Sequence, residues 1–341
     1  PALSGRGKSM IPQVLAFIIT YRCNFLCDHC SVSAGPGRRE VIAKDVMRLA
    51  IEQAYILPSI RVISFTGGEP SLYQDLLQDG IKLAHEKGFI TRLVTNAWWA
   101  QTPESAYRFL QDFRMVGLNE LNISYDDFHA AYLEAFGGEQ NVLNAVRAAT
   151  DLGMSVLVGS TLYPGAKISS GYLRRVFKDA GIQQEIKFLE DFVFPLGRAR
   201  QKLPAHFFPS DVEKRQRGGC NDAGQTLVIL PDGEVLFCCG HIVNSKAQEI
   251  MTIGSLASGT SLVEIVERMQ KNVFYWWLNL EGPEAVLTEL GVEKKFYRRC
   301  EACFYLGTAC REKLRALAKR KEEIFAQLEV KKWPINLVSG K

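Results

Sequence analysis

Hydrophobic positions in the first 190 residues follow two alternating patterns. Short continuous runs of β-branched and aromatic residues, such as 14–20, are typical of strands buried on both faces. Longer segments lie between these runs, and in segments such as 43–55 and 139–152 apolar residues recur every three or four positions. That spacing is typical of amphipathic helices, and glycines follow several of these segments. We therefore predict strands and helices that alternate along this part of the chain.

The alternation predicts six strands with helices between them. The strands are expected at 14–20, 61–65, 89–95, 120–124, 155–162 and 185–189, and the helices at 43–55, 72–87, 103–115, 139–152 and 169–180. Strands that alternate with helices are typical of a parallel α/β sheet or barrel. Because a complete barrel has eight such units, we expect a partial, TIM-like (β/α)6 barrel.

The pattern changes near residue 200. Segment 201–217 is irregular, whereas 225–237 is expected to form a β-hairpin because a Pro-Asp-Gly turn separates two apolar runs. A short helix is predicted at 262–270 and a long charged helix at 311–330. We therefore expect three parts: a tail at 1–13, the barrel at 14–205 and a second domain at 206–341.

Composition narrows the class of protein. The chain has 341 residues, 47% hydrophobic and 23% charged, which is typical of globular proteins and excludes a disordered or fibrous chain. The net charge of +4 gives no argument for nucleic acid as a partner. The apolar run at 14–20 is far shorter than the roughly 20 residues of a membrane helix, and no small-residue cleavage site follows it. We expect a cytoplasmic protein that binds neither nucleic acid nor membrane.

Nine cysteines carry most of the chemical information. They form two groups, one at 23–30 and the other at 220–310. The odd number, the tight local spacing and the lack of an export signal argue against a disulfide framework. Metal ligation or thiol chemistry is the better interpretation.

The first group, Cys23-x3-Cys27-x2-Cys30, directly follows the first predicted strand. Three thiolates on one loop can hold an iron–sulfur cluster, and three ligands leave one iron of a four-iron cube open for a substrate or cofactor. A structural zinc site is the alternative. Zinc requires a fourth ligand, and His29 lies between two of the cysteines, where its geometry suits poorly.

The sequence CNFLCDHC resembles the CxxxCxφC signature of the radical S-adenosylmethionine (SAM) superfamily, with His29 at the φ position. The resemblance continues in the expected order through residues 14–190. A Gly-Gly-Glu-Pro motif at 67–70 follows the second strand, and the ends of the third and fourth strands carry Thr95, Asn96, Ser124 and Asp126.

The resemblance implies a cofactor site. Cys23, Cys27 and Cys30 are expected to hold a [4Fe-4S] cluster whose open iron binds SAM. Gly67 and Gly68 are expected to let the backbone approach the methionine part of SAM. The remaining contacts to SAM are expected from Glu69 to the amine, the His29 backbone near adenine, and Thr95, Asn96, Ser124 and Asp126 to ribose and carboxylate groups.

Arg198 follows the sixth predicted strand in the sequence Pro-Leu-Gly-Arg. It is expected either to supply a positive charge near SAM or to form a surface salt bridge. Members of this family cleave SAM reductively to a 5′-deoxyadenosyl radical, which abstracts a hydrogen atom from the substrate. A flavodoxin- or ferredoxin-type protein is the expected electron donor.

The second cysteine group resembles the SPASM/Twitch extension of radical SAM enzymes. The resemblance implies that one auxiliary [4Fe-4S] cluster is held by Cys220, Cys238, Cys300 and Cys303. Cys239 and Cys310 are then left over, although Cys310 is an alternative to one of the four ligands. A zinc ribbon is the other interpretation of this group.

The segments at 94–100 and 123–129 resemble a radical SAM subgroup that includes peptide epimerases. We therefore expect a ribosomally made precursor peptide as the substrate and L-to-D epimerisation as the reaction. Cys239 or Cys310 is expected to donate the returning hydrogen atom, and a small buried hydrophobe is the alternative role for Cys239. Since thirteen residues precede the first strand, a separate leader-binding protein is one expected partner. The alternatives are peptide thioether or carbon–carbon crosslinking, dehydrogenation of a small metabolite, and a non-catalytic metal-binding protein.

Overall fold

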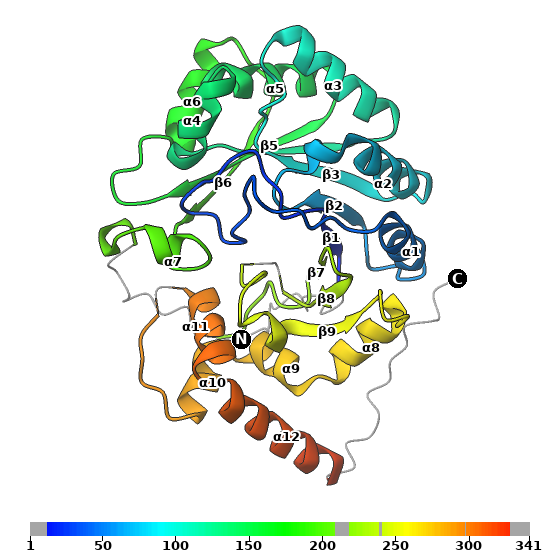
Figure 1. The fold of residues 1–341 in the computed structure, drawn as a ribbon, viewed down its shortest axis with the longest axis vertical. Coiled ribbons are helices and arrows are strands. Elements are labelled where there is room, and N and C mark those ends of the chain that lie inside the picture. The colour runs from blue at the N-terminus through cyan, green and yellow to red at the C-terminus, as the bar shows by residue number, and fades with distance from the viewer. Residues whose placement is uncertain (1–11, 209–217, 239–240, 297, 328–341) are drawn as a thin grey trace, which may run out of the picture.

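The computed structural model describes residues 12–208, 218–238, 241–296 and 298–327. Most of the predicted tail therefore lies outside the described residues. Six parallel strands form the first part of the molecule (Figure 1). They are β1 (Val14–Ile18), β2 (Val62–Thr66), β3 (Ile90–Thr95), β4 (Glu120–Ser124), β5 (Ser155–Leu162) and β6 (Lys187–Phe192), and each pairs with the next in chain order.

Helices cover the outer face of this curved sheet (Figure 1). They are α1 (Lys44–Ala54), α2 (Gln74–Glu86), α3 (Pro103–Met115), α5 (Glu139–Asp151) and α6 (Ser170–Asp179). The start of α3 shows the local cause: Pro103 occupies the first turn, and Thr102 and Ser105 form a capping box. This arrangement confirms the predicted partial (β/α)6 barrel.

Short helices that the periodicity did not predict lie just after the strands. A 3₁₀ turn, η1 (Pro70–Tyr73), precedes α2, and α4 (Asp127–Leu133) with η2 (Glu134–Phe136) follows β4. Strand β6 begins two residues later than predicted and extends three residues further. The segments η1, α4 and η2 are too short for a helical period to show in the sequence. Side-chain caps start two of them: Glu69 caps η1 and Asp126 caps α4.

The sheet continues beyond the barrel. The predicted hairpin forms as β7 (Thr226–Ile229) and β8 (Glu234–Leu236), and β9 (Thr252–Ser255) adds a further strand. Strand β7 pairs in parallel with β1, so the nine strands run in the order β6-β5-β4-β3-β2-β1-β7-β8-β9. One sheet therefore spans the boundary expected near residue 205.

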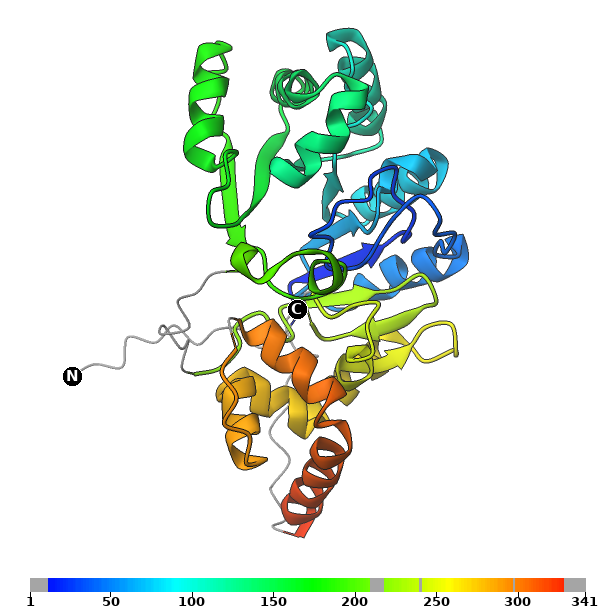
Figure 2. The same cartoon turned by 60° about the vertical axis from the view of Figure 1, so that its left-hand side comes forward.

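A group of helices packs beside the hairpin in the C-terminal part (Figure 2). They are α8 (Leu262–Lys271), α9 (Val273–Leu280), α10 (Pro283–Glu289), α11 (Arg299–Thr308) and α12 (Arg311–Gln327). The short α7 (Ala199–Lys202) and the turns η3 (Ala205–Phe207) and η4 (Gln248–Met251) complete the described elements. None of the helices in the described ranges is long and apolar enough to cross a membrane.

Candidate active site

A cavity of about 440 Å³ lies at the carboxyl ends of the barrel strands. Residues from both cysteine-loop and strand-end motifs line it: Cys23, Cys27, His29, Cys30, Gly67, Gly68, Glu69, Thr95, Asn96, Ser124 and Asp126. The fold thus brings together every residue expected to contact the first cluster or SAM except Arg198. A second hollow, of about 520 Å³, lies on the outer surface between α3 and α5 and contains none of these residues.

The loop that carries Cys23, Cys27 and Cys30 is held by hydrogen bonds to its sulfurs. The Phe25 amide donates to Cys23 Sγ at 3.3 Å, and the Ala34 amide donates to Cys30 Sγ at 3.4 Å. Burial raises the pKa of Cys23 to about 12 and that of Cys27 further still. Buried thiolates with amide donors are stable when they bind metal, so the donor set fits an iron–sulfur cluster.

Arg198 binds the backbone of this cysteine loop. Its guanidinium donates to the carbonyl oxygens of Cys27, at 2.7 Å, and of Ala34, and its own amide donates to Cys30 O at 3.0 Å. The positive charge lowers the pKa of Cys23 and Cys27, although burial has the larger effect. The structure therefore places Arg198 behind the cluster loop, where it shapes the loop and does not line the cavity.

Glu69 is fully buried and accepts four hydrogen bonds. Its Oε1 accepts from the Ser71 amide, from Ser71 Oγ at 2.6 Å and from Thr95 Oγ1 at 2.8 Å, and its Oε2 accepts from the Asn96 amide at 2.8 Å. Burial raises the pKa of Glu69 in spite of these donors. A cation at the cavity face of this carboxylate would favour its charged form, which suits the expected contact with an amine.

Gly67 and Gly68 are packed against the chain itself. Gly67 has a φ of +139°, and a Cβ on Gly68 would lie 2.1 Å from the carbonyl oxygen of Arg22. The amides of Gly68 and Glu69 donate to Thr20 O and Arg22 O at 2.7 and 2.8 Å. The two glycines therefore allow the Glu69 turn to dock on the start of the cysteine loop, a role that the motif alone did not predict.

His29, Asp126 and His129 form a buried group beside the cysteines. Asp126 caps α4 through the amides of Phe128 and His129, and it also accepts from His129 Nδ1 at 2.9 Å and from the Thr161 amide at 3.0 Å. Burial opposes ionisation of Asp126, but the two histidines and these donors bring its pKa well below the usual range. The Asp126 carboxylate thus accepts four hydrogen bonds from the chain.

The His29 ring stacks on Phe128 with centroids 4.5 Å apart, and its Nε2 lies 3.6 Å from Asp126 Oδ2. Burial lowers the pKa of His29 to about 4. Its Nδ1 is buried and has no hydrogen-bond partner within the described part of the chain. An unpaired buried nitrogen at the cavity wall fits a site that receives a polar ligand such as SAM.

His129 was not among the residues expected to contact the cluster or SAM. It occupies the first turn of a helix that starts at Asp126, and that capping pattern is the signal in the sequence that would have found it. Asp191 and His241 also line the cavity, from β6 and from the loop after β8. No local motif marks these two residues, because only the tertiary fold brings them to the barrel.

Four cysteines of the second group lie close to one another: Cys220, Cys238, Cys300 and Cys303. The charges of Cys238 and Cys220 raise the pKa of both Cys300 and Cys303, after burial as the largest cause. The Cys220 amide also donates to Leu278 O at 2.7 Å, which fixes this segment against α9. The structure therefore gathers the four residues expected to ligate an auxiliary cluster.

The two remaining cysteines of the second group are Cys239 and Cys310. Cys239 lies outside the described residues. Cys310 is only 4% exposed at the junction of α11 and α12, and it does not line the cavity. Its pKa is raised by burial and responds to Lys313, not to the charges of the other cysteines. The structure thus separates Cys310 from the candidate active site.

One set of three potential ligand atoms lies close together. Among the described residues, His29, Asp126 and His129 have ligand atoms that all lie within 4.8 Å of one another.

One family model matches a segment of the chain. Residues 17–170 match the model of the Radical SAM superfamily. This segment forms a radical SAM domain. The domain implies a [4Fe-4S] cluster and SAM as cofactors, and the cysteine loop and the cavity are the places that fit them.

Relatives of the chain extend beyond this segment. The putative peptide biosynthesis protein YydG of Bacillus subtilis is 22% identical over 303 residues, which cover 86% of this chain and 92% of YydG. GTP 3′,8-cyclase of Listeria monocytogenes is 29% identical over 217 residues and 60% of each chain. The solved structure of anSMEcpe with bound AdoMet has a TM-score of 0.54 at 13% identity and covers 91% of this chain and 99% of the other. The fold of that structure is therefore similar to this one over most of the chain.

Proposed function

We propose that this radical SAM enzyme modifies a ribosomally made peptide, by L-to-D epimerisation of a residue. The similarity to YydG carries the peptide proposal, because it extends over 86% of this chain and that relative is named as a putative peptide biosynthesis protein. The GTP 3′,8-cyclase of Listeria monocytogenes matches 60% of the chain, a smaller share than YydG does. Peptide crosslinking and dehydrogenation of a small metabolite remain the competing reactions.

The barrel also offers a place for an extended peptide. Strand β6 ends the sheet, and its Leu189 and Phe192 are 61% and 40% exposed although both line the cavity. Exposed apolar side chains on an end strand are a common feature of peptide recognition, since backbone hydrogen bonds hold the peptide and pockets select its side chains. This geometry supports a peptide entering beside β6.

Reductive cleavage of SAM at the cluster supplies a radical that removes a hydrogen atom from substrate carbon. In the proposal, Cys23, Cys27 and Cys30 hold the cluster, while His29, Gly67, Gly68, Glu69, Thr95, Asn96, Ser124 and Asp126 shape the SAM site. Arg198 holds the cysteine loop in place.

We propose Cys239 as the hydrogen donor. Cys310 lies away from the cavity, whereas His241, two residues after Cys239, lines it. The Cys239 thiol gives a hydrogen atom to the substrate carbon radical, and the resulting thiyl radical regains its thiol with one electron from a flavodoxin- or ferredoxin-type donor and one proton from solvent. Cys220, Cys238, Cys300 and Cys303 are proposed to hold one auxiliary [4Fe-4S] cluster. A separate leader-binding protein is proposed as an additional partner.

The deciding experiment measures iron, sulfide and 5′-deoxyadenosine on the anaerobically reconstituted protein. A variant with Cys23, Cys27 and Cys30 all replaced by alanine is the comparison. We expect about eight irons per chain in the wild type and about four in the variant, since each four-iron cluster binds through cysteine thiolates. The variant is expected to form no 5′-deoxyadenosine.

Peptides encoded beside the gene are then incubated with the wild-type enzyme in deuterated water. One deuterium at the α-carbon of a D-residue supports epimerisation, because a thiol exchanges its hydrogen with solvent. A mass loss of two hydrogens indicates crosslinking instead. Zinc at both cysteine groups and no cleavage of SAM would show that the protein is not a radical enzyme.

A further inference from the structure

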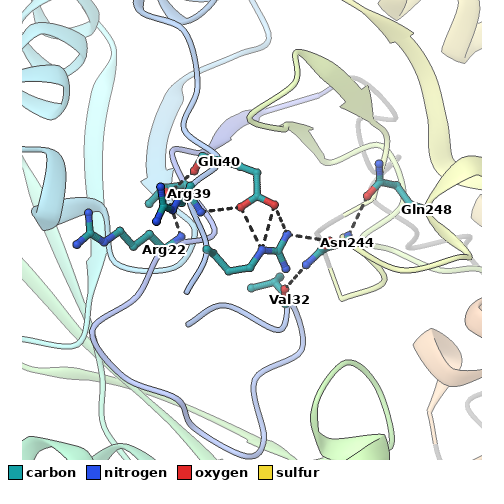
Figure 3. A network of polar contacts seen from close by, with 8 residues as sticks. Arg22, Val32, Arg39, Glu40, Asn244 and Gln248 are labelled. Atoms are coloured by element: carbon teal, nitrogen blue, oxygen red, sulfur yellow. Dashed lines mark hydrogen bonds and ion pairs between the residues drawn. The ribbon is translucent and has the colours of Figure 1, made fainter. Parts of the chain in front are cut away.

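The loop after Cys239 packs directly on the first cysteine loop, and Asn244 stands at the contact (Figure 3). Asn244 Nδ2 donates to the carbonyl oxygen of Val32 at 2.8 Å, two residues after Cys30. Asn244 Oδ1 accepts from Arg38 Nη2 at 3.3 Å. One side-chain amide thus bonds to both ends of the segment that closes the cysteine loop.

The partners of Asn244 are themselves held in place. Arg38 pairs with Glu40, with Nε and Nη2 at 3.0 and 2.7 Å from Oε1, and the Glu40 carbonyl accepts from Thr20 Oγ1 just after β1. These contacts hold the Arg38 guanidinium in the position from which it donates to Asn244. This series of hydrogen bonds therefore links the end of β1 to the side-chain amide of Asn244.

A second set of bonds ties Asn244 to the hairpin. Its backbone amide donates to Gln248 Oε1 at 2.8 Å (Figure 3). Gln248 Nε2 in turn donates to Glu234 Oε2 at 2.7 Å. Glu234 begins β8, the strand that leads to Cys238. Ile242 and Val243, on the same loop, are fully buried. The loop is thus anchored to β8 as well as to the barrel.

The backbone conformation at position 244 limits which residue types fit there. Asn244 has a φ of +56°, in the left-handed region that asparagine and glycine adopt most readily. Glycine would fit the backbone but would lack both side-chain bonds. Asparagine alone combines this conformation with an amide that donates and accepts at once.

We propose that Asn244 is a positioning residue that fixes the segment after Cys238 and Cys239 relative to the SAM-cluster loop. The inference rests on the proposed function, because return of a hydrogen atom requires the donor thiol to lie at a set distance from the substrate carbon. Without Asn244 the two loops separate more often. SAM is then still cleaved, but fewer cleavage events end in product.

The test uses Asn244→Gly, which keeps the backbone conformation and removes the contacts to Val32 and Arg38. Asn272→Gly is the matched control: Asn272 caps α9 through Oδ1, and a glycine at a cap costs only a few tenths of a kcal/mol. Hydrogen exchange is measured on the full chain without peptide. We expect exchange of residues 30–38 and 241–248 to rise about tenfold in Asn244→Gly alone, since two hydrogen bonds are lost.

The second measurement is the ratio of 5′-deoxyadenosine to modified peptide. We expect this ratio to rise about fivefold or more in Asn244→Gly, while SAM cleavage without peptide stays within about twofold of the wild type. Unchanged exchange in both loops would overturn the proposal. So would faster exchange with an unchanged ratio, or a parallel loss of SAM cleavage and product, because either result indicates a contact that only stabilises the fold.

Different results would contradict peptide modification and the positioning role of Asn244. If the wild type cleaves SAM and modifies none of the peptides, the peptide function is wrong, whereas the exchange measurement still decides whether Asn244 joins the loops. If the wild type modifies the peptide and Asn244→Gly keeps the same product ratio, the positioning role is wrong and the peptide function stands.

Discussion

Two buried carboxylates line the cavity, and their pKa values move in opposite directions. Glu69 is surrounded by hydroxyl and amide donors, and burial still raises its pKa. Asp126 is equally buried, yet His129 and His29 bring its pKa below the usual range. The hydroxyl and amide donors around Glu69 offset its lost hydration only in part. Glu69 is therefore the carboxylate that gains most from a cationic ligand.

Replacement of Cys239 tests its proposed role as the hydrogen donor. We expect Cys239→Ser to form 5′-deoxyadenosine with peptide present but to lose the epimerised product by at least about a hundredfold, because a hydroxyl donates a hydrogen atom far less readily than a thiol. Product is measured by chiral amino-acid analysis after hydrolysis.

Cys310→Ser is the matched control, since Cys310 is buried away from the cavity. It is expected to keep the product yield within about twofold once folded, although placing a hydroxyl in a buried site lowers stability. Loss of epimerisation in Cys310→Ser with full activity in Cys239→Ser would reverse the assignment of the donor.

At the scale of elements, the connections after the strands build the site. The turn from β2 into η1 crosses the chain at residues 20–22, and Gly68 stands where the two backbones meet. The turn that follows β4 starts α4 through the Asp126 cap. Regular strands and helices thus bring the motifs to one end of the barrel, and these irregular connections set their distances.

Gly68→Ala tests this crossing. The added Cβ would meet the Arg22 carbonyl at 2.1 Å, so we expect the free energy of unfolding to fall by about 3 kcal/mol or more. Gly37→Ala, in the same cysteine loop, is the control because no atom lies within 4 Å of its Cβ, and its effect is expected within about 0.5 kcal/mol. Chemical denaturation of the two variants measures the difference. Equal stability would mean that the turn moves aside at little cost.

At the scale of the whole molecule, the barrel and the C-terminal part share one sheet. Strand β7 covers the side of β1 that faces away from β2, with Val14 opposite Thr226 and Phe17 opposite Ile229. The Val14 amide donates to Gln225 O, while the Ile19 amide donates to Thr66 O on the β2 side. Amides along β1 therefore alternate between the two neighbouring strands. The first cluster loop, which follows β1, depends on both parts of the chain.

A fragment of residues 1–208 tests this dependence. Because it lacks β7, we expect the amides of Val14 and Ala16 to exchange at least about tenfold faster than in the full chain, while Leu15 and Phe17 stay protected by β2. The fragment is also expected to unfold at a lower temperature. Exchange that is unchanged at Val14 and Ala16 would show that the barrel stands without the added strands.

The sequence by itself determined the barrel and the composition of its site. Strand and helix periods depend on local burial, and the motifs follow strand ends, so six strands, the cysteine loop and the strand-end polar residues were predictable. Helices α9, α10 and α11 were not predicted. For α9 the reason is that Phe274, Tyr275, Trp277 and Leu278 are all buried, and a helix buried on several sides shows no clear amphipathic period.

Only the tertiary structure decided the contacts between distant segments. The pairing of β7 with β1, the binding of Arg198 to the cysteine loop, and the bonds of Asn244 to Val32 and Arg38 join residues far apart in the chain. The physical reason is that such contacts depend on the register of strands and the packing of connections, and local spacing carries no record of either. The residue types of the site thus follow from the sequence, and the contacts that join these distant segments follow from the fold.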